Sequence, residues 1–306
     1  MSFPFETVSH VLISVVIPVR NRTDLLRRAV GSVLRQTHRP LEVVVVDDCS
    51  SEDIAAALAD MAADNLPIRV LRNAENAGGQ ASRLAGVRAA SGNVVALLDS
   101  DDWWEPTKLQ LQLDALLHNP GSLVSCRLLL ATSGKVTPPV VIERGEPVQE
   151  YVYSRGGFLQ TSTFMASRPL LLDALAASQM DCHDDTYLAL WLRARGVRIV
   201  QLEAALTHFD DFPRHDRMSI VEAQADKAYE LFERINVDWS ARAKAGYLVR
   251  DTVRRHIHNH MPLRALATLA RAWHPGLPLS LYARTLLAIV FGGSPLRFFR
   301  RRPQEH

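Results

Sequence analysis

The first hundred residues alternate between short apolar runs and segments whose apolar side chains recur at helical spacing. The apolar runs are predicted strands, and they cover residues 11–19, 41–46, 68–71 and 94–98. The segments between them are predicted helices, which run through residues 25–34, 54–61 and 79–90. Strands separated by helices pair in parallel, because each helix carries the chain back across the sheet. The pattern therefore predicts an α/β fold with a Rossmann-like, mostly parallel sheet flanked by helices.

The composition is that of a globular chain large enough for a full core. The 306 residues are 47% hydrophobic and 22% charged, and the net charge is only +2. So small a net charge gives no argument for nucleic-acid binding, and none is expected. The three cysteines show no Cys-x-x-Cys spacing, which fits a reducing compartment. The first residues also lack the basic and apolar pattern of a signal peptide, so we expect a cytoplasmic protein.

Three carboxylates follow the fourth predicted strand within four positions, at Asp99, Asp101 and Asp102. Acidic side chains this close repel one another, so the motif favours a bound cation. Mg²⁺ and Mn²⁺ are the suitable ions, because they combine one or two protein carboxylates with water and phosphate oxygens. The alternative is a solvated acidic turn that caps a helix beginning near Pro106.

The loops that follow parallel strands are where ligands bind in such sheets. A second acidic pair, Asp47 and Asp48, follows the second predicted strand, so two of the four strand ends are acidic. We expect Asp47 to cap the turn that follows it. The sequence contains neither the glycine pattern of a dinucleotide-binding sheet nor that of a P-loop. A nucleotide site would therefore have to be built from other groups.

Four segments taken together resemble the family 2 glycosyltransferases of GT-A fold. They are residues 13–21 (ISVVIPVRN), 43–50 (VVVVDDCS), 76–86 and 98–102 (LDSDD). The resemblance extends over roughly residues 11–220, and its ordered spacing makes it more specific than any single motif. It implies an inverting, metal-dependent transferase that moves a sugar from a nucleotide-diphospho-sugar to a glycan or lipid-linked acceptor of the cell envelope.

The resemblance places most donor-binding residues at the strand ends. Asp48 would accept a hydrogen bond from the imide of the donor's base, which favours a UDP-sugar. Arg83 would pair with phosphate, although a helix-surface arginine is the alternative. Asp99 would face the ribose and the metal, and Asp101 would coordinate Mn²⁺ or Mg²⁺ between the phosphates. The remaining donor-binding residues that the resemblance implies are Pro18, Asn21, Asn76 and Ser100.

A histidine is the further metal-ligand candidate that the resemblance implies. Residues 212–219 are similar to the family segment that folds over the donor phosphates, and they contain His215. His208 is the alternative, because the spacing leaves the register open. The chain departs from the family at Arg20, where an aromatic residue is usual, and at Leu84, where asparagine often follows the arginine.

Transfer with inversion needs a base that removes the proton of the acceptor hydroxyl. By resemblance that base is Asp185, and Asp184 stands beside it in place of the usual glutamate. Capping the helix that follows is the alternative role of both aspartates. On the acceptor side the resemblance places Gln160, Thr161 and Asp184. Trp103 and Trp104 are candidates to stack on a sugar ring, with sealing of the fold as the alternative.

The resemblance divides the chain into a GT-A catalytic domain, residues 1–219, and a helical C-terminal extension, residues 220–306. The nucleotide-sugar-binding half covers about residues 11–105 and the acceptor half about residues 106–219. In the extension, residues 277–291 are apolar but too short to cross a bilayer, and four arginines follow among the last ten residues. This combination favours peripheral contact with anionic lipid on the inner face of the cell membrane. Packing against the catalytic domain is the alternative.

A catalytically inactive nucleotide-sugar-binding or scaffold protein of the same fold is the alternative function. The retention of Asp48, Asp99, Asp101 and Asp185 together favours an enzyme, because a scaffold needs none of these acids and would be more stable without them. A nucleotidyltransferase usually places a glycine in the loop after its first strand. Residues 20–23 here contain none.

Overall fold

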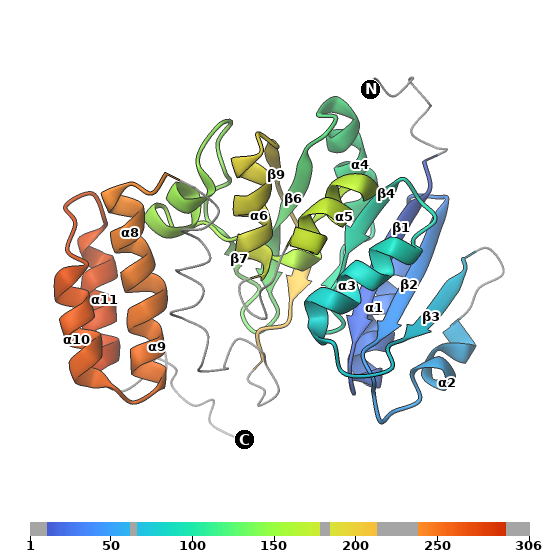
Figure 1. Cartoon of the computed structure of the whole chain (residues 1–306), viewed down its shortest axis with the longest axis horizontal. Coiled ribbons are helices and arrows are strands. Elements are labelled where there is room, and N and C mark those ends of the chain that lie inside the picture. Colours follow the sequence, from blue (N-terminus) through green and yellow to red (C-terminus); the bar gives the residue numbers. More distant parts are fainter. Residues whose placement is uncertain (1–10, 62–65, 178–183, 213–237, 292–306) are drawn as a thin grey trace, which may run out of the picture. The chain divides into compact units, whose positions relative to one another are not determined.

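The computed structural model describes residues 11–61, 66–177, 184–212 and 238–291 (Figure 1). The chain divides into two compact units. The first comprises the chain up to Glu146 together with Phe158–Asp216, and the second comprises Pro147–Gly157 together with the chain from Arg217 onwards. Residues 147–157, expected within the acceptor half, therefore group with the C-terminal helices.

The first unit is built on one sheet. Its strands are β1 (Ile13–Val19), β2 (Leu41–Asp47), β3 (Ile68–Arg72), β4 (Val94–Leu97), β5 (Trp103–Trp104), β6 (Leu123–Leu130), β7 (Val136–Thr137), β8 (Met165–Ser167) and β9 (Ile199–Phe209). Among the described residues their order is β3-β2-β1-β4-β8-β6-β9-β5, with β7 paired to β6. The first four strands are mutually parallel, as predicted, because β1 pairs in parallel with β2 and β4, and β2 with β3.

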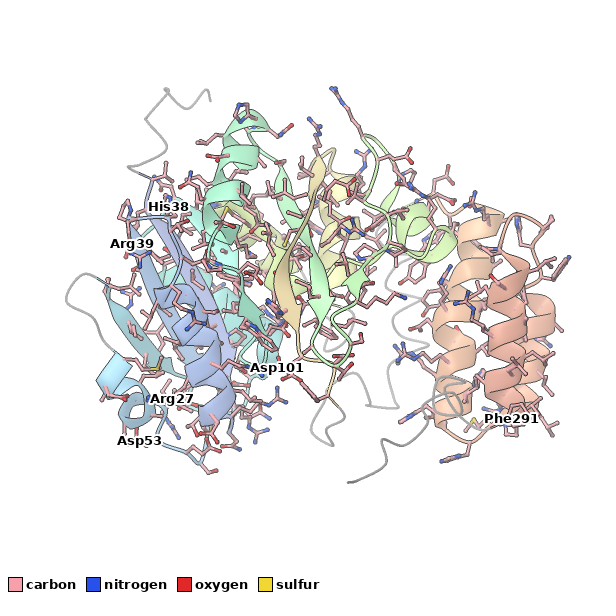
Figure 2. The ribbon with its side chains drawn as sticks, turned by 180° about the vertical axis from the view of Figure 1, so that it is seen from behind. Arg27, His38, Arg39, Asp53, Asp101 and Phe291 are labelled. Atoms are coloured by element: carbon pink, nitrogen blue, oxygen red, sulfur yellow. The ribbon has the colours of Figure 1, made fainter. Side chains whose placement is uncertain are left out.

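Helices cover both faces of this sheet. They are α1 (Thr23–Leu34), α2 (Ile54–Leu58), α3 (Gly78–Ala89), α4 (Lys108–His118), α5 (Arg168–Ala177) and α6 (Asp184–Ala194). Apolar residues of α1, α2 and α4 form one core with alternate residues of β1 and β2, and α1 is the helix of Arg27 in Figure 2. On the other face α3 approaches closely, since a Cβ atom on Gly86 would meet Val16 Cγ1 at 2.4 Å and Val46 Cγ2 at 3.0 Å. The predicted helix-flanked sheet is confirmed.

Helix α1 shows how the apolar spacing selects the buried face. Leu26, Ala29, Val30 and Val33 are all buried in the core, and they follow the i, i+3, i+4, i+7 spacing of one helix face. Asp24, two positions before the first of these buried residues, is exposed. The helix therefore forms where the sequence pattern predicts it.

Lys108 is a fully buried lysine at the start of α4. Its ammonium lies 3.8 Å from the centre of the Trp104 ring and donates a hydrogen bond to Gln112 Oε1 at 2.5 Å. Burial lowers the pKa of Lys108 to about 8, and the nearby Cys126 thiol opposes this shift only in part. The charged form of the lysine thus lowers the stability of the fold at neutral pH.

The free energy of unfolding is expected to rise with pH above 8 in the wild type, relative to Lys108→Met. An unfolded lysine titrates near pH 10.4, so between these values the unfolded chain holds more protons than the folded chain. As the pH rises through this range, the free energy of unfolding of the wild type should increase by up to about 3 kcal/mol relative to that of Lys108→Met. Urea unfolding of both proteins at pH 7.5 and pH 10 measures it, and an unchanged difference would contradict the assignment.

The described residues of the second unit beyond Asp238 are mostly helical, as predicted for the C-terminal extension. Its described helices are α8 (Ala241–Tyr247), α9 (Val253–His258), α10 (Pro262–Arg271) and α11 (Leu279–Val290). A π-helical segment, Leu248–Thr252, joins α8 to α9. Ala245, Val249 and Tyr282 belong to one small core of this unit, and Val253 and Ile289 belong to another. Within the described ranges, none of the helices combines the length and apolar character needed to cross a bilayer.

Candidate functional site

The carboxyl ends of β1, β2 and β4 meet at one edge of the sheet, because these strands are parallel neighbours. Asn21, Asp48 and Asp99 each follow one of these strands within two positions. Asp101 lies at the same edge (Figure 2). The fold therefore brings together loops that the sequence places up to eighty residues apart.

The acidic loop, residues 99–102, presents two partly exposed carboxylates. The side chains of Asp99 and Asp101 are 22% and 19% exposed. Arg83 Nη2 lies 2.6 Å from Asp99 Oδ1, and Arg22 Nη1 lies 3.3 Å from Asp101 Oδ2. Each acid thus has a guanidinium close enough to balance its charge. Arg83 is largely buried, so the alternative of an ordinary helix-surface arginine does not describe it.

These carboxylates fit the expected divalent ion. They are hard oxygen ligands that remain accessible to water and to phosphate, as Mn²⁺ and Mg²⁺ require. In the part of the chain that the structure describes, no three His, Cys, Asp or Glu side chains form a closed metal cage. Within the described ranges, an ion held by Asp99 and Asp101 would therefore leave coordination positions for water and the donor.

Asp102, the third acid of the loop, is buried and anchors it. Its carboxylate accepts hydrogen bonds from Ser162 Oγ at 2.6 Å, Gln160 Nε2 at 2.9 Å and the Asp210 amide at 2.9 Å. Burial holds the pKa of Asp102 well above its usual range, and the charges of Asp101 and Asp99 raise it further. Asp102 therefore positions the loop, whereas the other two acids face the open edge.

Gln160 links the acceptor-side segment to the acidic loop. Its Nε2 donates to Asp99 Oδ2 at 3.1 Å as well as to Asp102, and its Oε1 accepts from the Ser162 amide at 2.8 Å. Gln160 and Thr161 are each 5% exposed. The structure thus brings Gln160 to the metal-ligand candidates, while its contact with an acceptor stays a prediction.

The prediction that Trp104 stacks on an acceptor sugar is wrong. The residue is only 2% exposed, its indole Nε1 donates to the Ser162 carbonyl at 2.8 Å, and Lys108 lies over the ring. A ring enclosed in this way has no free face for a sugar. Trp104 instead has the alternative role and seals the fold.

Trp103, the other stacking candidate, is partly exposed and belongs to a cluster not predicted from the sequence. Its ring stacks on His208 with centroids 4.8 Å apart and planes at 6°, and the Arg28 guanidinium lies 4.0 Å from the centre of the Trp103 ring. Arg28 Nη2 also donates to the Asp101 carbonyl at 2.5 Å and pairs with Asp210 Oδ2 at 2.6 Å. Arg28 is therefore a positioning residue for the acidic loop.

His208, one of the two histidine candidates for the metal, lies in this cluster. Its Nε2 contacts Glu105 Oε1 at 2.7 Å, and its ring face is covered by Trp103. These contacts support a structural role for His208. His215, the other candidate, lies outside the described residues.

Asp48 organises the loop that leads into α3. Its two oxygens accept hydrogen bonds of 2.8–2.9 Å from Asn73 Nδ2, Ala77 N, Gly78 N and, with its amide suitably oriented, Asn76 Nδ2. A carboxylate has about four acceptor positions, so these four donors use its capacity. This role was not predicted, and the contact of Asp48 with a base stays a prediction.

The remaining donor-side candidates connect the first two strand-end loops. Asp47 Oδ1 accepts from the Ser50 amide at 2.8 Å, which confirms the predicted cap. Asn21, with a φ of 51°, accepts from the Ser51 amide at 2.7 Å. Pro18, within β1, and Ser100 are both buried. Of these candidates, Asn21 therefore presents an exposed polar side chain at the edge.

Asp185 lies in the first turn of α6, which begins at Asp184. The side chain of Asp185 is partly exposed, and its Oδ1 accepts from the Thr186 amide at 2.7 Å. Helix α6 packs on α5, and α5 packs on α3, so α6 lies on the α3 face of the sheet (Figure 1). A partly exposed carboxylate at a helix start is suited to accept a proton, and its contact with Thr186 also fits the capping alternative. The base role of Asp185 and the acceptor role of Asp184 stay predictions.

Comparison with known proteins gives a family match over the region that contains the acidic loop. The family model described as "Glycosyl transferase family 2" matches residues 14–166, which is half of the chain. The putative teichuronic acid biosynthesis glycosyltransferase TuaG of Bacillus subtilis is 37% identical over 107 residues, 35% of this chain and 42% of TuaG. The amylovoran biosynthesis glycosyltransferase AmsB of Erwinia amylovora is 25% identical over 206 residues, 64% of this chain and 68% of AmsB.

A third relative has a more specific name. The Escherichia coli protein WfgD, a UDP-Glc:alpha-D-GlcNAc-diphosphoundecaprenol beta-1,3-glucosyltransferase, is 32% identical over 108 residues, 35% of this chain and 42% of WfgD. The matches to TuaG and WfgD thus span less than half of those proteins.

Solved structures share the fold over most of the chain. Staphylococcus aureus TarS 1–349 in complex with UDP-GlcNAc matches with a TM-score of 0.60 and 18% identity, over 92% of this chain and 87% of that one. The mannosyltransferase PcManGT from Pyrobaculum calidifontis, in complex with GDP-Man and Mn²⁺, matches with a TM-score of 0.60 and 19% identity, over 92% and 85%. These matches show the GT-A fold, and the predicted fold class is confirmed.

Proposed function

The chain belongs to glycosyl transferase family 2, and from that premise we propose that it is an inverting, metal-dependent sugar transferase. The donor is a nucleotide-diphospho-sugar, and the acceptor is a hydroxyl group of a glycan or of a lipid-linked sugar. The bond between the anomeric carbon and the donor phosphate breaks, and a bond to the acceptor oxygen forms on the opposite face of the sugar.

The observation that supports this most strongly is the charge arrangement of the acidic loop. Two partly exposed carboxylates, Asp99 and Asp101, lie at the ligand-binding edge of the sheet, and each is paired with an arginine. An edge that holds both signs of charge can bind a cation and a diphosphate together. Arg83 would exchange its contact with Asp99 for a phosphate oxygen, which a guanidinium binds with two parallel hydrogen bonds.

Asp99 and Asp101 are the residues that would hold Mn²⁺ or Mg²⁺, with His215 as the further candidate. Such an ion, when bound, acts as a Lewis acid that stabilises negative charge on the departing nucleoside diphosphate. Arg28 and Asp102 keep the loop in position by their contacts with Asp210. Asp185 accepts the proton of the acceptor hydroxyl as its oxygen attacks the anomeric carbon.

UDP is the proposed nucleotide. Asp48 lies beside the strand ends as an acceptor-only group suited to an imide N–H, although a bound base would compete with the loop for it. The name of WfgD specifies a UDP-sugar donor and a lipid-linked acceptor, and TarS is solved with UDP-GlcNAc. PcManGT, solved with GDP-Man, supports GDP as the competing choice.

A nucleoside diphosphate release assay tests the proposal. The full chain is mixed with UDP-, GDP- and dTDP-sugars in turn, with Mn²⁺ and a set of soluble and lipid-linked sugar acceptors. We expect release from the sugars of one nucleotide, stimulated by the correct acceptor and lost when EDTA is added. Nucleotide binding without release from any donor would instead support the inactive scaffold of the same fold.

A further inference from the structure

An excess of positive charge lies near the C-terminal end of the chain. Residues 252–304 contain nine arginines and neither lysine, aspartate nor glutamate. Because the whole chain has a net charge of +2, the remaining residues carry −7. A segment of fifty-three residues without one carboxylate is strongly cationic, whereas the rest of the chain is acidic.

Helices α10 and α11 of this region each expose an apolar stripe. On α11 the stripe is Leu279, Ala283, Leu286, Leu287 and Val290, and on α10 it is Leu263, Leu266, Ala267 and Ala270. Leu263, Leu279 and Val290 are 81%, 70% and 65% exposed. The opposite sides of both helices, with Ala265, Tyr282 and Ile289, already form the cores of this unit. The outer apolar stripes are therefore additional to what the fold needs.

Arginine and tryptophan side chains accompany these stripes. Arg264 and Arg271 are exposed on α10, and Arg284 is exposed on α11 next to Ala283. Trp273, in the connection between the helices, is 58% exposed and packs on Tyr282. Phe291, which follows α11, is also exposed (Figure 2). The sequence beyond Phe291 adds four arginines. Exposed leucines beside arginines and tryptophan are typical of helices that lie in a membrane interface.

We propose that α10 and α11 dock this unit on an anionic lipid bilayer. The apolar stripes enter the boundary between headgroups and acyl chains, and the arginines contact lipid phosphates. A nucleic acid would match the positive charge but offers no acyl interior for the leucines. An acidic protein would match the positive charge as well, but exposed leucines beside arginines and tryptophan on both helices favour the interface of an anionic bilayer. The inference rests on the charge and exposure of this region and is independent of the transferase activity.

Vesicle co-sedimentation of the full chain tests the proposal. Vesicles are made of phosphatidylcholine alone or of an equimolar mixture with phosphatidylglycerol. We expect binding to the anionic vesicles at least about tenfold tighter than to the neutral ones, and weakened by salt. Leu286→Glu combined with Val290→Glu should lower that affinity at least about tenfold, because a charge on each inserted stripe position is costly. Arg264→Gln combined with Arg271→Gln should weaken binding to the anionic vesicles only.

Leu111→Glu, at an exposed position of α4 in the first unit, is the matched control and should bind as the wild type does. Circular dichroism of each variant verifies that the helices are retained, since all substituted positions are exposed. Equal binding of the wild type and the Leu286→Glu/Val290→Glu variant would overturn the proposal, as would no binding to anionic vesicles. Binding to a DNA duplex that the Leu286→Glu/Val290→Glu substitutions do not change would assign the region to nucleic acid instead. All of these variants should release nucleoside diphosphate at the wild-type rate when the acceptor is soluble.

Discussion

Replacing Asp185 with asparagine is expected to lower the turnover number of sugar transfer roughly 10²–10⁴-fold, the usual contribution of a general base. The amide cannot take the proton of the acceptor hydroxyl, yet asparagine is as good a helix cap as aspartate. Helix α6 should therefore keep its start, and the affinity for the nucleotide should not change. Steady-state kinetics with a saturating donor, together with a nucleotide titration, measure both quantities.

Asp173→Asn provides the comparison, because Asp173 is an exposed acid on the neighbouring helix α5. It should retain the wild-type turnover number. If Asp185→Asn also retained it, Asp185 would be a helix-capping residue, and another group would have to act as the base.

Replacing Asp101 with asparagine is expected to lower the kcat/KM of the transfer about 10³-fold and to remove its stimulation by Mn²⁺. An ion that stabilises the leaving diphosphate contributes several kcal/mol, and about 4 kcal/mol corresponds to this factor. A neutral amide is a weak ligand for a hard cation, and Asp99 alone would hold the ion poorly. Initial rates over a range of Mn²⁺ concentrations measure the loss.

Asp60→Asn removes a different carboxylate that is paired with an arginine, since Asp60 contacts Arg27 at the surface. This variant should respond to Mn²⁺ as the wild type does. A variant at Asp101 that kept both its rate and its metal response would show that the ion, if used, binds elsewhere.

The first half of the fold could be predicted because its signals are local. Strands β1, β2 and β4 begin and end within a few residues of the predicted apolar runs. Helix α1 buries the apolar side chains that recur at helical spacing. Parallel pairing then fixes which loops meet at the carboxyl edge. The acidic loop and the Asp47 cap could be found in the same way.

Contacts between distant segments could not be predicted, because no local pattern encodes them. Arg28 meets Asp210, 182 positions later, and Asp102 meets the amide of the same residue. Trp103 and Trp104 are adjacent, and the strand that they form points them to opposite faces, so one is partly exposed and the other is buried. The sequence alone does not state which of them faces the core.

Residues 147–157 illustrate the same limit for the domain organisation. Within them, Glu150–Ser154 form a single π-helical turn that carries no amphipathic repeat. Their place is set by α8, where a Cβ atom on Gly246 would meet the Tyr153 carbonyl at 2.1 Å. Residues 147–157 and α8 lie about ninety residues apart in the sequence, so only their packing shows that they belong to one unit.

Calorimetric titration of UDP, GDP and dTDP into the full chain, with and without Mn²⁺ and repeated on Asp101→Ala, tests the central claim most directly. The proposed site predicts that one nucleotide, UDP, binds to the wild type in the presence of Mn²⁺ and that the substitution abolishes this binding. If none of the three nucleotides bound to the folded wild type with Mn²⁺ present, the acidic loop would not be a donor site and the transferase assignment would fail.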